Sequence, residues 1–374
     1  MLPHGRGKLP GFDTLRLLGS LSVLFSHSYL IAQDTDASEP FQMLLRGEKN
    51  IAGLYGVFVF FILSGFLLSR SLHHNPSILR FITNRLLRLL PGFIFCILIT
   101  AWIIAPLCSR DGPMAYFASG AGWPYFRDSL RTLNDAPLSG LFNYTSSVSQ
   151  VVNGSLWSLR IEVLCYALLL SFWSLFPSPG WVALAWGGLG AFILFDPAHA
   201  ASLPVNTYPL PYFAAGVVVW WLCHHLGMGR PVAYMCLAGL TAGVLLGFPH
   251  LAFAVFGAYS VIALGCRFPL LDPWIARTGD LSYGVYLFGW PIQQMLRQWL
   301  DLRQPLLMFV LSAVVTGLLA YVSFHWVEQP GMALRTPLLR ALEGFRLPLP
   351  SPDRAREGSN APSVPEACRS PWGG

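Results

Sequence analysis

The sequence contains few charged residues for its length. Only 11% of its 374 residues are Asp, Glu, Lys or Arg, whereas soluble domains carry about 25%. Because so few charges could not cover the two or three soluble domains that the length would suggest, we exclude a soluble organisation. In contrast, 54% of the residues are hydrophobic. This composition indicates that lipid, and not water, surrounds most of the chain.

Lysine is nearly absent. Lys8 and Lys49 are the only two lysines, so arginine supplies nearly all of the positive charge. The formal net charge is +6. The arginines form no single basic run, which argues against a nucleic-acid-binding surface. They flank apolar segments instead, as cationic residues do at the cytoplasmic side of membrane proteins.

Three further signatures are missing. The seven cysteines have neither the spacing of a zinc site nor that of a redox pair, so no metal site is predicted. No internal repeat of the kind found in many transporters is visible. The first apolar stretch carries Asp13, Arg16 and His27 and lacks a convincing cleavage site, so we interpret it as a retained helix and not as a signal peptide.

Ten apolar segments have lengths that suit or approach a membrane-spanning helix. They are residues 12–32, 52–69, 89–106, 156–176, 181–195, 208–225, 232–247, 250–266, 281–299 and 306–326. We therefore predict an all-α fold, a polytopic integral membrane bundle of about ten transmembrane helices, over residues 1–332. From residue 333 to residue 374 the composition changes to Pro, Arg, Ser and Gly, which predicts a disordered cytoplasmic tail.

The cationic residues predict the orientation of this bundle. If the N-terminus is cytoplasmic, fifteen Lys and Arg residues lie in cytoplasmic segments and six lie in outer segments, or nine against six without the tail. The positive-inside rule therefore places both termini in the cytoplasm. The hydrophilic connection 107–155 would then lie at the outer face and fold partly over it.

The first apolar segment contains a line of polar side chains. Arg16 and His27 are eleven residues apart, which brings them within about 20° of each other around a helix, and Asp13 lies near the same stripe. Ionisable residues inside a membrane are costly and usually functional. The alternative is an arginine that snorkels to the interface and a histidine with structural hydrogen bonds. Histidine is the side chain best suited to act as a general base near neutral pH.

A carboxylate, Glu162, lies near the start of the fourth segment. Counted from the ends of the predicted spans, Glu162 and His27 have similar depths below the outer face, so the sequence predicts that they meet. A carboxylate beside a histidine would orient the imidazole of a general base. A structural pair of Arg160 with Glu162 is the alternative, although residues two apart do not share a helix face.

Two further groups of polar residues are candidates for binding. Arg85 and Arg88 lie one turn apart at the foot of the third segment, where they could bind phosphates or mark topology beside anionic lipid. Tyr283, Tyr286 and Gln293 lie in the ninth segment, where they suit a sugar or an amide-rich arm. Tyrosines near a helix end are more often interface anchors.

Taken together, these residues resemble the acyltransferase 3 family of membrane O-acyltransferases, which modify bacterial surface polysaccharides and related glycans. The resemblance covers about residues 9–332. Six elements carry it in order: Arg16 with His27, Ser64-Gly65-Phe66, the run FITNRLLRLLPG, Trp157 with Glu162 in NGSLWSLRIE, the run LSYGVYLFGWPIQQ, and Glu328 with Pro330. Two positions depart from the family pattern. Gly289 stands where many members have a histidine, and Arg160 stands where small residues or proline are common.

The resemblance implies an enzyme of the bacterial inner membrane. This enzyme would transfer an acyl group from acyl-CoA to a hydroxyl of a polysaccharide or lipid-linked glycan, with acetyl as the first candidate for the acyl group. Acyl-CoA would be a substrate, and no permanently bound cofactor is implied. A glycan or lipid transporter without transfer activity is the alternative, and the oligomeric state, homodimer included, stays open. The predicted site comprises His27 and Glu162 as catalytic residues, Arg16, Arg85 and Arg88 for the donor, and Asp13, Asn153, Trp157, Tyr283, Tyr286 and Gln293 for the substrates.

Overall fold

The computed structural model describes residues 9, 11–45, 50–144, 148–196, 206–226, 229–267 and 269–342. Within these residues the chain is helical and forms no strand, which confirms the predicted all-α class. The long helices are α1 (Phe12–Gln33), α3 (Ala52–His74), α4 (Ile78–Ile99), α8 (Trp157–Leu175), α9 (Pro179–Phe195), α11 (Leu210–Leu226), α12 (Arg230–Leu245), α14 (Ala258–Arg267), α16 (Ser282–Leu300) and α17 (Pro305–Ser323).

Shorter helices connect or extend these. They are α2 (Pro40–Leu45), α5 (Ala105–Leu107), α6 (Gly112–Ser119), α7 (Gly122–Thr132), α13 (Pro249–Ala252), α15 (Asp272–Thr278), α18 (Gln329–Ala333) and α19 (Arg335–Leu342). Three π-helical turns, η1 (Thr100–Ile104), η2 (Phe253–Gly257) and η3 (Phe324–Glu328), continue α4, α13 and α17 without a break.

Each of the ten predicted spans contains a helix, but the described residues hold six helical stretches that are long and apolar enough to cross a membrane. These six are Phe12–Gln33, Ala52–His74, Ile78–Leu107, Trp157–Leu175, Pro249–Arg267 and Pro305–Leu342. Helices α9, α11 and α12 are apolar but shorter. The protein is thus an integral membrane protein, and the count of about ten spans stays a prediction.

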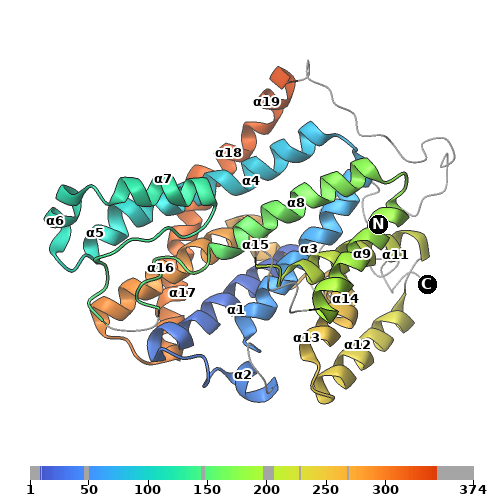
Figure 1. The fold of residues 1–374 in the computed structure, drawn as a ribbon, viewed down its shortest axis with the longest axis horizontal. Coiled ribbons are helices and arrows are strands. Elements are labelled where there is room, and N and C mark those ends of the chain that lie inside the picture. The colour runs from blue at the N-terminus through green and yellow to red at the C-terminus, as the bar shows by residue number, and fades with distance from the viewer. Residues whose placement is uncertain are drawn as a thin grey trace.

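Helix α3 lies in the centre of the bundle, between α1 and α11 (Figure 1). Glycines allow the close approach of α3 to α11. A Cβ atom on Gly65 would lie 2.2 Å from the carbonyl oxygen of Phe213, and one on Gly216 would lie 2.2 Å from that of Ile62. Because no side chain fits at either position, the two backbones pack directly against each other, as in other membrane helix pairs with small residues at the contact.

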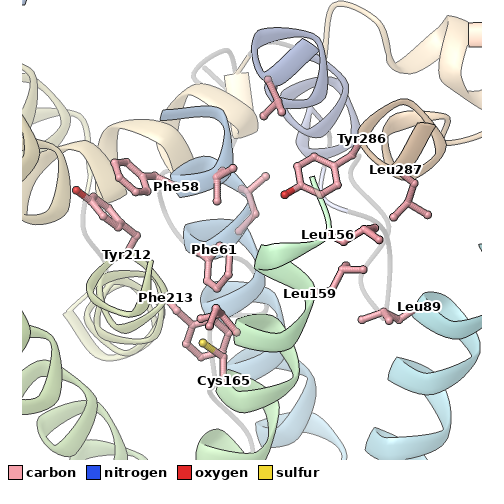
Figure 2. Close-up of a cluster of buried hydrophobic side chains, with 14 of the residues drawn as sticks. Phe58, Phe61, Leu89, Leu156, Leu159, Cys165, Tyr212, Phe213, Tyr286 and Leu287 are labelled. Atoms are coloured by element: carbon pink, nitrogen blue, oxygen red, sulfur yellow. The ribbon is translucent and has the colours of Figure 1, made fainter. Parts of the chain in front are cut away.

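Buried aromatic and aliphatic side chains fill the spaces beside α3 (Figure 2). Phe58 of α3 stacks on Tyr212 of α11 with ring centroids 3.5 Å apart. At the opposite side of the cluster, Leu159 in the first turn of α8 points toward Leu89 of α4 and Leu287 of α16. Helix α8 therefore begins in contact with the core of the bundle.

The segment before α8 runs alongside α16 into the bundle. The Gln294 side chain donates a hydrogen bond to the Val151 carbonyl at 2.9 Å, and the Asn153 side chain donates one to the Leu287 carbonyl, also at 2.9 Å. Gln294 is seven residues beyond Leu287, roughly 10 Å further along the helix. Residues 148–156 therefore descend along α16 into the bundle, whereas the position of the connection 107–155 at the outer face stays a prediction.

The rest of this connection is compact. Helices α5, α6 and α7 lie together at the left edge of the molecule in Figure 1. Arg110 donates hydrogen bonds from Nε to the carbonyls of Leu141 and Phe142 at 3.1 and 2.7 Å, which ties the two ends of this part together.

The predicted tail begins with helical structure. Helix α17 continues through η3 and α18 to α19, which packs against α4. Residues 335–342 of the tail that was predicted to be disordered are therefore helical. Its remaining residues, 343–374, lie outside the described residues.

Candidate active site

A cavity of about 100 Å³ lies among α1, α3, α4, α8 and α16. Three of the side chains that line it are the arginines predicted to bind the donor, and one is a carboxylate. The lining residues are Arg16, Val57, Phe60, Phe61, Ser64, Arg85, Arg88, Leu89, Ser158, Leu159, Glu162, Tyr166, Ser282, Tyr283 and Tyr286. The tertiary structure thus assembles a cationic cavity from five helices.

The arginines reach this cavity from two helices. Arg16 lies near the start of α1, where it forms an ion pair of 3.3 Å with Asp13, one turn before it. Arg85 and Arg88 lie three residues apart on α4, so both point to the same side of that helix. The starts of α1 and α4 both lie on the side of the bundle that the arginine distribution predicts to be cytoplasmic.

Arg88 is fixed by a second carboxylate. Its guanidinium donates a hydrogen bond of 2.6 Å to Asp280, which precedes α16. Asp280 also accepts hydrogen bonds from the hydroxyl and the backbone N–H of Ser282, at 2.5 and 3.2 Å. Asp280 and Arg88 are 192 residues apart in the sequence, so no local pattern could have identified this pair.

Glu162 faces the arginines and not His27. Its carboxylate accepts a hydrogen bond from Tyr166 on the next turn of α8, and it lines the same cavity as Arg85 and Arg88. The prediction that Glu162 meets His27 assumed that α8 starts at the outer face. Because residues 148–156 descend into the bundle first, Glu162 reaches the level of the arginines instead.

His27 lies further along α1, outside the lining of this cavity. Its ring packs edge-on against Trp290 of α16, with centroids 4.7 Å apart and planes at 80°. Its Nδ1 atom is buried and has no hydrogen-bond partner among the described residues. One turn before it, the Leu24 carbonyl accepts a hydrogen bond of 2.8 Å from Gln293. These contacts hold α1 and α16 together around the imidazole.

The remaining predicted substrate residues separate into two groups. Tyr283 and Tyr286 line the cavity, where the Tyr283 hydroxyl donates to the Leu89 carbonyl at 2.8 Å. Asn153 and Trp157 do not line it. The amide of Asn153 donates to the Leu287 carbonyl and accepts from the N–H of Ser155, so it anchors the descending segment.

Four hydroxyl-bearing residues of the cavity lining were not predicted as site residues, namely Ser64, Ser158, Tyr166 and Ser282. Ser64 was named in the Ser64-Gly65-Phe66 element without a role in the site. From the NGSLWSLRIE run that contains Ser158, only Trp157 and Glu162 were singled out. The signal that could have found Ser158 is its spacing of four residues from Glu162, which places both side chains on one face of the helix.

Comparison with known proteins decides the family. Residues 9–325 match the family model described as an acyltransferase domain. The chain belongs to the acyltransferase 3 family. Since the match covers nearly the whole membrane part, this acyltransferase 3 protein is an O-acyltransferase, and the prediction of an enzyme is confirmed over that of a transporter.

Three curated proteins are similar to this acyltransferase over most of their lengths. An O-acetyl transferase of Shigella phage Sf6 is 24% identical over 343 residues, which cover 88% of this chain and 97% of the relative. Nodulation protein 10 of Rhizobium leguminosarum bv. viciae is 25% identical over 382 residues, covering 90% and 96%. The exopolysaccharide production protein ExoZ of Rhizobium meliloti (strain 1021) is 27% identical over 343 residues, covering 83% and 97%. No solved structure gives a significant match.

Gly289 of this acyltransferase lies at a close contact between α16 and α1. A Cβ atom on Gly289 would lie 2.8 Å from the Cδ1 atom of Leu24 in α1. A larger residue there would require the end of the flexible Leu24 side chain to shift, and no backbone atom of α1 lies within 4 Å of that position.

Proposed function

We propose that this acyltransferase transfers an acyl group from acyl-CoA to a hydroxyl of a polysaccharide or lipid-linked glycan at the bacterial inner membrane. Acetyl is the first candidate for the acyl group. The observation that carries the proposal is the cavity that Arg16, Arg85 and Arg88 line. The names of two relatives, an O-acetyl transferase and an exopolysaccharide production protein, support the acetyl group and the acceptor class.

The arginines suit the donor because it carries phosphates. Guanidinium groups form strong, geometrically specific hydrogen bonds with phosphate oxygens. Three arginines against the single carboxylate of Glu162 give the cavity lining a net charge of +2. The positive-inside rule supports a cytoplasmic position for this cavity, from which acyl-CoA would enter.

His27 is the proposed general base. It lies eleven residues beyond Arg16, about 16 Å further along the axis of α1. A donor whose phosphates contact the arginines would extend its flexible arm in this direction and bring its thioester toward the imidazole. Since the Nδ1 atom of His27 has no partner in the described part of the chain, the ring keeps the capacity to exchange a proton.

The reaction follows from these positions. The hydroxyl oxygen of the acceptor attacks the carbonyl carbon of the thioester, and the imidazole of His27 takes the hydroxyl proton as the new C–O bond forms. The C–S bond then breaks, and the leaving thiolate takes the proton back from the imidazolium. The products are the O-acylated glycan and free coenzyme A, and His27 returns to its neutral form.

The test of this function is the variant His27→Ala. Removal of a general base lowers the rate about 100- to 10,000-fold, so acyl transfer and acyl-CoA hydrolysis should fall together while donor binding persists. Mass spectrometry of surface glycans should show loss of the acyl mass. The exposed His225, which bonds its own helix at the Trp221 carbonyl, provides the control variant His225→Ala. Transfer by His27→Ala at nearly the wild-type rate would contradict the mechanism.

A further inference from the structure

Two hydroxyl groups meet inside the cationic cavity. Ser158 Oγ of α8 and Tyr286 Oη of α16 lie 2.6 Å apart, and both side chains are buried. Both residues line the cavity that contains the three arginines. Figure 2 shows the Tyr286 hydroxyl directed from α16 toward α3 and the beginning of α8.

One hydroxyl hydrogen of this pair is not used in the bond between Ser158 and Tyr286. Two hydroxyl groups carry two protons, and the bond between Ser158 and Tyr286 uses one of them. Neither oxygen has another partner among the described residues. Whichever hydroxyl donates within the pair, the other has a free O–H group, and the cavity is the space beside it. A buried O–H group without an acceptor is unfavourable, so an acceptor in the cavity would stabilise the pair.

The pair lies between the arginines and His27. Tyr286 follows Tyr283, which bonds α4 at the Leu89 carbonyl, by about 4.5 Å along the axis of α16. It precedes Trp290, which contacts His27, by about 6 Å. A donor that reaches from the arginines to His27 must pass the pair with the middle of its arm.

We propose that Ser158 and Tyr286 recognise an amide carbonyl of the pantetheine arm of the donor. This rests on the proposed function, because it takes acyl-CoA as the donor. The arm carries amides between the phosphates and the thioester, and an amide oxygen is the acceptor that the free O–H group lacks. Beside the pair, Val57, Phe60 and Phe61 line the cavity and suit the methyl and methylene groups of the arm.

The pair is not assigned to the thioester itself. The thioester must lie beside His27 to react there, roughly one helical turn beyond Tyr286. Ser158 and Tyr286 are therefore donor-binding residues in this proposal. Their loss should weaken binding of every ligand that contains the arm, whether or not it carries an acyl group.

Binding of two probes to the purified full-length protein tests this. Free coenzyme A has the arm and no thioester, whereas adenosine 3′,5′-bisphosphate has phosphates and no arm. Tyr286→Phe and Ser158→Ala should each weaken coenzyme A binding about 2- to 13-fold, as expected for one neutral hydrogen bond. Both variants should bind the bisphosphate like the wild type. Tyr116→Phe, which loses a buried hydroxyl bound to the Ala101 carbonyl outside the cavity, should change neither.

Three results would overturn the proposal. Equal weakening of both probes would show that the variants disturb the whole cavity. Unchanged coenzyme A binding with a large fall in kcat would assign the pair to the thioester oxyanion. A wild-type protein that binds neither probe would reject the donor itself, and the proposed function would fail together with the pair.

Discussion

At the scale of single residues, Arg85 and Arg88 have different surroundings although they share one sequence motif. Arg88 donates a 2.6 Å hydrogen bond to Asp280, and the side chains are 28% and 10% exposed. Arg85 lines the cavity beside Tyr166 and Glu162. We therefore expect Arg85 to be the more available of the two for the phosphates of a donor, and Arg88 to fix α4 to the start of α16.

The two arginine variants should accordingly differ. Arg85→Ala should raise the donor KM with a smaller change in kcat and little change in Tm. Arg88→Ala should lower the stability by about 3–5 kcal/mol, because it leaves the buried Asp280 charge without its partner. Steady-state kinetics and thermal unfolding in detergent measure both effects. The double variant Arg88→Ala with Asp280→Asn should recover part of the lost Tm, and no recovery would contradict the structural role of the pair.

Glu162 also has a testable role at this scale. Since its carboxylate faces three arginines, Glu162→Gln should make the cavity more cationic and strengthen binding of adenosine 3′,5′-bisphosphate about 5-fold, or ~1 kcal/mol. The gain should shrink at high salt. Isothermal titration at two salt concentrations measures it. A variant with unchanged phosphate binding and a strongly reduced kcat would instead support the partnership of Glu162 with His27.

At the scale of elements, the descending segment 148–156 decides where α8 begins. Besides its contacts with α16, this segment is held by a half-buried carboxylate of the preceding loop. Asp135 accepts hydrogen bonds from the Val152 N–H at 2.9 Å and from the Tyr125 hydroxyl at 3.2 Å. Burial raises the pKa of Asp135 to about 6. Ionisation of Asp135 is therefore less favourable in the folded protein than in the unfolded chain.

This carboxylate should make stability depend on pH. A folded-state pKa above the ordinary value of 3.8 means that the stabilising effect of protonation is fully present below about pH 4 and is lost as the pH rises through about 6. The loss amounts to about 3 kcal/mol. Thermal unfolding between pH 4.5 and 7.5 should show wild-type stability falling relative to Asp135→Asn. Parallel curves for the two proteins would show that Asp135 does not titrate in this range.

At the scale of the whole molecule, the orientation in the membrane is the main prediction. Arg80, at the start of α4, and Met114, after its end, are both exposed and lie on opposite sides of this span. An impermeant thiol reagent added to intact cells should label Met114→Cys and should label Arg80→Cys only after permeabilisation. The reverse pattern would place the cationic cavity at the outer face and contradict the entry of acyl-CoA from the cytoplasm.

The helices were predictable because apolar length is a local property. Each predicted span contains a helix of the structure, and the arginine motif and the Arg16–His27 spacing were visible in the sequence. The number of membrane-spanning helices was harder to predict, because α9 and α11 have 17 residues each and α12 has 16. These lengths fall below the roughly 20 residues of a full span.

The sequence by itself determined the class, the family and the residues that could carry chemistry, because periodicity, composition and short motifs depend only on neighbours along the chain. Which of those residues meet was decided by the tertiary structure. Ser158 and Tyr286 are 128 residues apart, and their contact depends on the descent of residues 148–156 beside α16. That descent also moves Glu162 from the predicted level of His27 to the arginines. Depth in a bundle is set by packing between distant segments, and counting residues from helix ends cannot supply it.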